Sequence, residues 1–299
     1  MINTSETELP IVLYDCFSNQ RFGGNVGGIV LDAANLDSIQ MQKVAREINA
    51  PVTGFVTGKD DNEITVRFFM PGAEIAMCGH VTVGLFSHFA GNSDGIKDFV
   101  MKASAGDVKV QVTSKSGTLP NVMMQLSPPT MTQNDVDLVA LASALDVAGS
   151  SIGTRASVAG ADAGLKHLFV HLESLAEVEN LSPDFQKLTQ VSKDNNVQTI
   201  ACFSMETVDA ANTLHIRDFC PAVGVDEVPA SGTTNGALAG YLLEHGFIAK
   251  EDQQILAEQG QEIGRPSLIC SEIKILEGKI DTLKVGGQAV ASVRGTLTI

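Results

Sequence analysis

The sequence predicts an α+β protein built from two similar domains, and three observations support this. Short segments with strand patterns outnumber amphipathic helices, and they do not alternate as regular β-α-β units. The chain has 299 residues, enough for two domains that each bury a core of their own. A weak repeat also relates the first half of the sequence to the second.

The strand prediction rests on alternation and on short apolar runs. Residues 107–114 place Val108, Val110 and Val112 on one face at a period of two, which is typical of a half-buried strand. Further strands are expected at residues 64–70, 167–172, 197–205, 267–275 and 291–299.

One amphipathic helix is clear among these strands. Residues 38–49 place their apolar side chains on a single stripe, which consists of Met41, Val44, Ala45 and Ile48. The polar, proline-bearing residues 127–135 lie near the middle of the chain, where they predict a domain boundary.

The internal repeat joins two motifs that carry chemically useful side chains. Residues 67–71 read Arg-Phe-Phe-Met-Pro and are followed by Cys-Gly-His at 78–80. Residues 217–221 read Arg-Asp-Phe-Cys-Pro and are followed by Ser-Gly-Thr at 231–233. A segment containing glycine and alanine comes after each triplet, so each half is expected to deliver a Cys or Ser and a glycine to the start of a helix.

Helix starts of this kind favour the binding of small anions. Their backbone N–H groups are unpaired and carry partial positive charge, and glycine lets a ligand approach the backbone closely. Two such starts facing each other across a cleft would bind a small carboxylic acid from both sides. The same field is expected to lower the pKa of the Cys78 thiol, and the thiolate is the reactive form.

Composition and charge exclude several other functions. The formal net charge of −15 argues against nucleic acid or an anionic membrane surface as a partner. There is no apolar run long enough to span a membrane, and the first ten residues are too polar for a signal peptide. The five cysteines are widely spaced, which predicts reduced thiols in the cytoplasm, and the lone Cys-x-His at 78–80 is too little for a metal site.

Six stretches, in order along nearly the whole chain, resemble one family. They are residues 14–31, 41–56, 77–84, 217–242, 258–267 and 285–295. They are similar to the PhzF-like (phenazine-biosynthesis) proteins, which lie within the diaminopimelate epimerase and proline racemase superfamily.

The resemblance implies a fold, a domain organisation and an assembly. Each domain would be a curved mixed β-sheet or barrel rolled around a central helix, as in diaminopimelate epimerase. The N-terminal domain would comprise residues 1–125 plus 285–299, the C-terminal domain residues 126–284, and the active site would lie in the cleft between them. The resemblance also implies a homodimer that works without a cofactor.

Two departures from the family pattern bear on the chemistry. Family members that shuttle protons use a glutamate and an aspartate where this sequence has Val52 and Val228. Cys78 stands where racemases of the wider superfamily have their first catalytic cysteine, and Ser231 stands at the position of their second. The site therefore looks like a Cys/Ser version of a two-thiol racemase.

These residues predict an isomerase or epimerase that removes a proton next to the carboxylate of a small amino or hydroxy acid. Cys78 would be the base, and His80 would orient a carboxylate or carry a second proton, as the family's corresponding histidine does. Ser231 is a poor general acid, so the dehydration of a hydroxy amino acid stays an alternative. The set of expected catalytic residues is Cys78, His80 and Ser231, and the expected substrate-binding residues are Asn25, Gly79, Gly232 and Thr233.

Other interpretations of the same residues stay open. Cys78 could be a packing residue and Ser231 a simple helix cap. The loss of both carboxylates, at Val52 and Val228, would suit a catalytically silent ligand-binding protein. A redox or metal-responsive cysteine protein is the third class. The remaining cysteines are expected to pack in strands, and the remaining histidines, His88, His167, His171, His215 and His245, to be scattered structural or surface residues.

Overall fold

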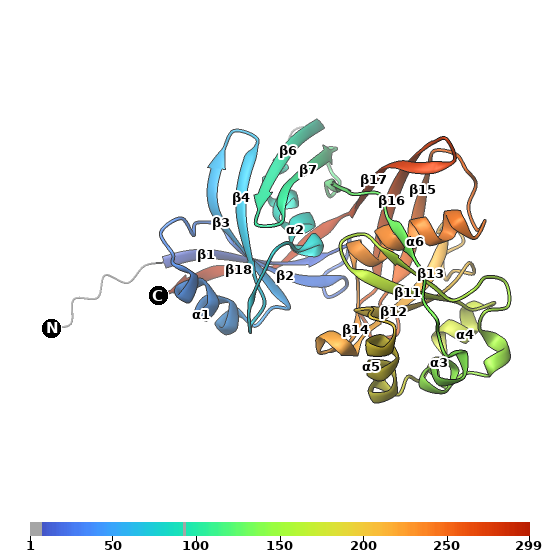
Figure 1. Cartoon of the computed structure of the whole chain (residues 1–299). Helices are drawn as coiled ribbons and strands as arrows, with labels where there is room; N and C mark the ends of the chain where they lie inside the picture. Colours follow the sequence, from blue (N-terminus) through green and yellow to red (C-terminus); the bar gives the residue numbers. More distant parts are fainter. Residues whose placement is uncertain (1–7, 92–93) are drawn as a thin grey trace. The chain divides into compact units, whose positions relative to one another are not determined.

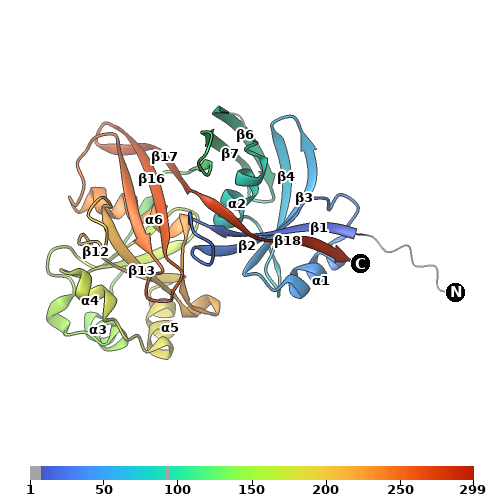
Figure 2. The ribbon, with the colours of Figure 1, turned by 180° about the vertical axis from the view of Figure 1, so that it is seen from behind.

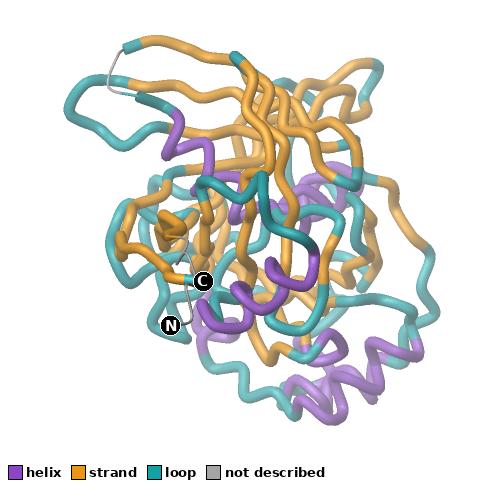
Figure 3. Tube along the Cα trace, turned by 90° about the vertical axis from the view of Figure 1, so that its left-hand side faces the viewer, coloured by secondary structure: helices purple, strands orange, loops and turns teal. Residues whose placement is uncertain are grey.

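The structure is a computed structural model that describes residues 8–91 and 94–299. The chain divides into two compact units, one formed by Met1–Met124 and Gly286–Ile299 and the other by Gln125–Val285. The α+β class is confirmed, since much of the trace runs in strands, with shorter helices among and beside them (Figure 3).

In its described residues the first unit contains the helices α1 (Ser38–Ile48) and α2 (Gly79–Phe89) and most of the longer strands (Figure 1). Its strands are β1 (Glu8–Cys16), β2 (Asn25–Val30), β3 (Val52–Asp60), β4 (Glu63–Phe69), β5 (Glu74–Ile75), β6 (Gly95–Ala103), β7 (Gly106–Ser114), β8 (Asn121–Leu126) and β18 (Ala289–Thr298). The C-terminal β18 pairs with β1 in antiparallel fashion, and the two strands run side by side in Figure 2.

The second unit contains more helices and shorter strands. Its helices are α3 (Leu138–Leu145), α4 (Leu175–Glu179), α5 (Phe185–Asp194) and α6 (Gly232–Glu244), with 3₁₀ turns η1 (Gly149–Ser151) and η2 (Pro221–Val223). Its strands are β9 (Thr130–Thr132), β10 (Ala159–Asp162), β11 (Lys166–His171), β12 (Thr199–Ser204), β13 (Leu214–Cys220), β14 (Val225–Val228), β15 (Gln253–Gln259), β16 (Ser267–Leu276) and β17 (Lys279–Gly287).

Strand pairing repeats from one unit to the other. In the first unit β2 is parallel to β3, β3 antiparallel to β4, and β4 parallel to β6. In the second unit β11 is parallel to β12, β12 antiparallel to β13, and β13 parallel to β15. The register also corresponds, because Phe68 lies opposite Gly54 and Asp218 lies opposite Ala201. The repeat seen in the sequence is therefore a repeat of structure.

Each unit wraps strands around one helix of small and apolar residues. Helix α2 packs on β1, β2, β3 and β18, and α6 packs on β9, β10, β11 and β16. A Cβ atom at Gly84 would lie 2.9 Å from the Cys16 sulfur and 3.0 Å from the Tyr14 Cβ. Glycine at this position therefore lets α2 lie directly against β1.

The predicted amphipathic helix is α1, and its ends have clear causes. Asp37 and Gln40 form a capping box at its start, and Asn49 ends it in the left-handed conformation, with φ of 53°. Its buried residues, Met41, Val44 and Ala45, pack with Phe55 and Phe69 in the core of the first unit. Strands are also found at every predicted strand segment, with bounds that differ by two residues or fewer.

A second core fills the space between α3, α4, α5 and the sheet of the second unit. These helices gather at one end of that unit (Figure 1). Leu141, Leu145 and Leu188 lie in this cluster together with Leu168 of β11 and Ile200 of β12. The apolar cluster covers one face of the strands that carry the second half of the repeat.

Candidate functional site

The first candidate site is the start of α2, where a loop after β4 delivers Cys78. Cys78 is the residue before the helix and has extended backbone, with φ of −142° and ψ of 115°. Its side chain makes no capping hydrogen bond of regular geometry, unlike a serine or aspartate at a helix start. The backbone N–H groups of Val81 and His80 interact with the sulfur and lower its pKa, as expected at a helix start.

Cys78 and His80 form a contact pair at this helix start. The Cys78 sulfur lies 3.3 Å from Nδ1 and 3.8 Å from Nε2 of the His80 ring. Cys78 is buried, and burial raises its thiol pKa to about 12 despite the two backbone N–H groups. Burial likewise lowers the pKa of His80 to about 4. The resting pair is therefore a neutral thiol beside a neutral imidazole.

The low thiol pKa expected from the sequence is wrong for this structure. The helix start acts in the expected direction, but it is outweighed because the sulfur is almost fully removed from solvent. A buried thiolate needs a compensating cation, and His80 stays neutral. The sequence pattern located the helix start but could not show how deeply Cys78 is buried.

The second candidate site is the start of α6, which repeats the backbone of the first. Ser231 has φ of −140° and ψ of 117°, almost the same angles as Cys78. Unlike Cys78 it does cap its helix, because the N–H of Thr234 donates to Ser231 Oγ at 3.2 Å. Thr233 Oγ1 lies 3.2 Å from the same oxygen. Ser231 is half-buried, so its hydroxyl lies at the edge of the unit's interior.

Each helix start is preceded by an Arg–Glu pair that the sequence reasoning did not identify. Arg67 donates from Nε and Nη2 to Glu74 at 2.8 and 2.7 Å. Arg217 donates in the same way to Glu227 at 3.0 and 2.8 Å. In both halves the glutamate stands four residues before the Cys or Ser. That shared spacing is the signal from which the pairs could have been found.

The predicted substrate-binding residues follow the two helix starts. Asn25 is buried at the first position of β2, next to Val26, whose backbone forms a hydrogen bond with His80. Gly79 opens α2, and a Cβ there would lie 3.3 Å from the Met124 side chain. Gly232 and Thr233 open α6 in the second unit. Asn25 and Gly79 thus lie near the Cys78–His80 pair within the first unit.

The two valines that replace the family carboxylates occupy element ends. Val52 is buried at the start of β3, opposite Gly27 of β2, and Val228 is half-buried at the end of β14. Neither side chain can carry a proton. Cys78 and His80 are the ionisable side chains between Cys78 and the end of the first turn of α2.

The remaining cysteines are mostly buried, as expected for packing residues, and of the remaining histidines His167, His171 and His215 are buried while His88 and His245 are half-buried. Cys16, Cys202 and Cys220 are buried in strands and Cys270 is half-buried in β16. Within residues 8–91 and 94–299 no group of His, Cys, Asp or Glu side chains is arranged to hold a metal ion. No helix in the same described ranges is both long and apolar enough to cross a membrane.

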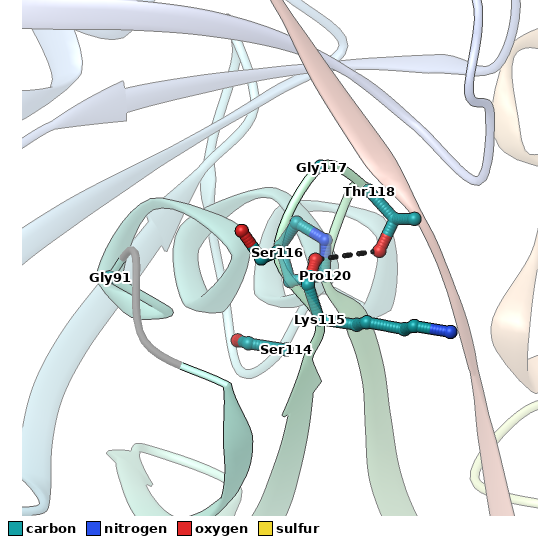
Figure 4. Close-up of a pocket in the computed structure, with 7 residues that line it drawn as sticks. All are labelled: Gly91, Ser114, Lys115, Ser116, Gly117, Thr118 and Pro120. Atoms are coloured by element: carbon teal, nitrogen blue, oxygen red, sulfur yellow. Dashed lines mark hydrogen bonds between the residues drawn. The ribbon is translucent and has the colours of Figure 1, made fainter.

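A small polar pocket lies at the turn between β7 and β8, apart from the candidate residues. It is lined by Gly91, Ser114, Lys115, Ser116, Gly117, Thr118 and Pro120 (Figure 4). Thr118 Oγ1 donates to the Lys115 carbonyl at 2.8 Å, which closes the turn. None of the residues predicted for the site lines this pocket.

The fold is shared with known isomerases. The solved PhzF-family phenazine biosynthesis protein of Bacillus anthracis superposes with a TM-score of 0.88 at 24% identity, covering 98% of this chain and 100% of that one. The hydroxyproline epimerase of Agrobacterium vitis superposes with a TM-score of 0.64 at 12% identity, covering 99% and 93% of the two chains. At these identities the likeness concerns the fold alone.

Sequence comparison gives the family. The chain belongs to the family described as phenazine biosynthesis-like protein, whose sequence model matches residues 14–295. It is 31% identical to an uncharacterized isomerase of Mesorhizobium japonicum, over 96% of this chain and 98% of that protein. It is 30% identical to the trans-2,3-dihydro-3-hydroxyanthranilate isomerase of Pseudomonas chlororaphis, over 96% and 99%. By class the chain is an isomerase, which confirms the enzyme class expected from the sequence.

Proposed function

We propose that this isomerase moves a proton at a carbon next to the carboxylate of a small amino or hydroxy acid, with Cys78 as the proton-abstracting group. The observation that carries the proposal is the 3.3 Å contact between Cys78 and His80 at a helix start. A thiolate formed at a site with so high a thiol pKa is a strong base, as a weak carbon acid requires.

In this proposal His80 is the group that accepts the proton of the Cys78 thiol. If the Cys78 proton passes to His80 Nδ1, the site gains a thiolate and an imidazolium together and its net charge stays zero. The backbone N–H groups at the start of α2 would bind the substrate carboxylate and the charge that develops on it. Asn25 and Gly79 belong to the same proposed binding site.

In this proposal Ser231, with Gly232 and Thr233, acts on the opposite face of the substrate. Return of a proton there gives an epimer or a shifted double bond, whereas loss of a leaving group gives a dehydrated product. The family resemblance leads us to add a homodimeric assembly in the cytoplasm, which works without a cofactor. Light scattering of the purified protein would test the assembly.

The test is proton NMR in D2O with defined probes. They are trans-2,3-dihydro-3-hydroxyanthranilate, named by the Pseudomonas relative, and trans-4-hydroxy-L-proline, bound in the Agrobacterium structure, together with diaminopimelate. We expect at least one probe to exchange its carbon-bound proton or to form product with the wild type and not with Cys78→Ala.

A second cysteine provides the matched control. Cys270 is half-buried in β16 and belongs to no proposed site, so Cys270→Ala should keep the activity. Equal activity of wild type and Cys78→Ala would contradict the role of Cys78. An inactive wild type on every probe would favour the ligand-binding alternative.

A further inference from the structure

A buried chain of polar side chains runs inward from Ser231 in the second unit. Thr234 Oγ1 lies 2.8 Å from Ser231 Oγ and 2.6 Å from Asp218 Oδ2. His167 Nδ1 lies 3.3 Å from Thr234 Oγ1 and 2.8 Å from Thr199 Oγ1. All but Ser231 are buried, so a carboxyl group inside the unit is connected to a half-buried hydroxyl by a single intervening side chain.

The first unit has apolar residues at the equivalent positions. The strand registers and the helix starts align Asp218 with Phe68 and Thr234 with Val81. The same alignment matches His167 and Thr199, which lie opposite each other in β11 and β12, to Gly27 and Val52. The fold therefore does not require a polar network here. The polar side chains are specific to the unit whose helix start bears a hydroxyl rather than a thiol.

The polar network of the second unit can compensate for the low acidity of the Ser231 hydroxyl. An alcohol is a poor proton donor by itself, but a carboxylic acid connected to it by hydrogen bonds can restore its proton as it is given up. We propose that Asp218 and Thr234 form a proton relay that ends at Ser231 and supplies the proton returned to the substrate. The relay rests on the proposed function for its substrate, and it acts through Ser231 rather than on the substrate directly.

The proton transfers balance along the chain. Ser231 gives its hydroxyl proton to the substrate carbanion, forming a C–H bond, and takes the hydroxyl proton of Thr234. Thr234 takes the proton of the Asp218 carboxyl group, which ends as a carboxylate. When the Thr234 hydroxyl instead donates to Asp218, the Asp218 carboxyl group is ionised and the relay has already given up its proton.

Asp218 is suited to hold that proton at mildly acidic pH, up to its pKa of about 6. Burial raises its pKa to about 6, against the lowering effect of the Thr234, Thr199 and Cys220 side chains, and the charge of Glu227 raises it further. His167 cannot compensate for the carboxylate, because burial lowers the pKa of its ring and keeps it neutral. Besides His167, the ionisable groups that interact with Asp218 are Glu227 of β14, Cys202 of β12 and Cys220 of its own strand.

The first test is an infrared titration of the full-length protein labelled with ¹³C at the aspartate side chains. We expect one protonated carboxyl band that disappears near the pKa of Asp218 and is absent from Asp218→Asn. Thr234→Val should move this titration upward by about one pH unit, since it removes a hydrogen bond to the carboxylate. Thr234→Ser keeps the hydroxyl and should match the wild type. An unchanged titration in Thr234→Val would overturn the relay.

The second test uses the probe compound that the wild type converts. Product formation should fall about 100-fold in Asp218→Asn and Thr234→Val, while Cys78-dependent deuterium uptake into the remaining substrate falls less than about threefold. In the wild type, the rate of product formation should decline as the pH rises through the pKa of Asp218. The pH profile of Asp218→Asn should not show this decline. Full product formation by Asp218→Asn would refute the relay and leave the proposed function intact. A wild type inactive on all probes would count against the proposed function, and the infrared titration alone would then decide whether the relay exists.

Discussion

At the scale of single residues, burial decides the state of Cys78. The helix start supplies two backbone N–H groups to the sulfur, yet the thiol keeps its proton because it is buried. A field from the backbone lowers the pKa of a thiol by stabilising its charge, while burial in an apolar surrounding raises it. The sequence identified the first influence, and only the packing of α2 on its strands reveals the second.

Cys78 should therefore react slowly with alkylating agents at neutral pH in the unliganded protein. Its thiol pKa of about 12 predicts that the rate of modification by iodoacetamide keeps rising up to about pH 11. Mass spectrometry of the modified peptide measures this rate for Cys78 alone. A rate that levels off below pH 8 would show that the thiolate already exists in the resting enzyme.

His215 should make the stability of the second unit depend on pH. Its ring lies 3.1 Å from Glu258 and 2.7 Å from Glu262. Burial lowers the pKa of His215, but its hydrogen bonds to the carboxylates of Glu262 and Glu258 outweigh burial, and the pKa is raised. The stabilisation is thus fully present below the unfolded-state pKa of about 6.5 and is lost as the pH rises through the folded-state pKa.

Urea unfolding of wild type and His215→Gln at several pH values checks this. We expect the variant to lose about 3 kcal/mol in the free energy of unfolding near pH 6, with a smaller difference near pH 9. His245 lies at the end of α6 and has no such pair of carboxylates, so His245→Gln serves as the control. A difference that grows with pH would have the wrong sign for a protonated His215.

At the scale of elements, the two Arg–Glu pairs are alike in geometry and unlike in burial. The side chains of Arg217 and Glu227 are 8% and 6% exposed, against 31% and 37% for Arg67 and Glu74. Exposed ion pairs contribute little to the free energy of unfolding, whereas removing one partner of a buried pair leaves an uncompensated charge in the interior. The Arg–Glu pair at the loop before α6 should therefore contribute far more to stability than the pair at the loop before α2.

Glu227→Gln should lower the free energy of unfolding by about 3 kcal/mol, because Arg217 would be left buried with a weaker partner. Glu74→Gln is its matched control and should cost less than about 1 kcal/mol. Chemical denaturation followed by circular dichroism measures both. Equal costs for the two substitutions would contradict the role assigned to burial.

Strands, the first helix and the repeat could be predicted because they depend on patterns within short segments. The stripe of Met41, Val44 and Ala45 is such a pattern, and so is the pair of helix starts. The group around Asp218 could not be predicted in this way, since its side chains come from β11, β12, β13 and α6. The Arg–Glu pairs were hidden because the loops that separate Arg from Glu differ in length between the two halves.

At the scale of the whole chain, the last strand belongs to the first unit. Strand β18 pairs with β1 along its whole length, from Glu8 opposite Thr298 to Cys16 opposite Ala289. Strand β1 also pairs with β2 on its other side. Residues far apart in sequence thus complete one sheet, and the first unit depends on the end of the chain.

Removal of residues 289–299 should therefore destabilise the first unit selectively. We expect amide hydrogens of β1 to lose at least about tenfold in protection from exchange, while those of β12 and β13 in the second unit keep theirs. Hydrogen exchange with mass spectrometry resolves the two sets of peptides. Equal loss of protection in β12 would indicate that the two units unfold as one.

The alignment of Asp218 with Phe68 has a consequence for the history of the chain. A gene duplication yields two copies with one backbone plan, and each copy can then change its interior independently. Here the interior behind the Cys78 helix start is apolar, and the interior behind the Ser231 helix start holds a carboxyl group that is linked to the Ser231 hydroxyl through Thr234. Two units with one backbone plan can thus differ in their chemistry through a few side chains inside the sheet, while the pairing of their strands stays the same.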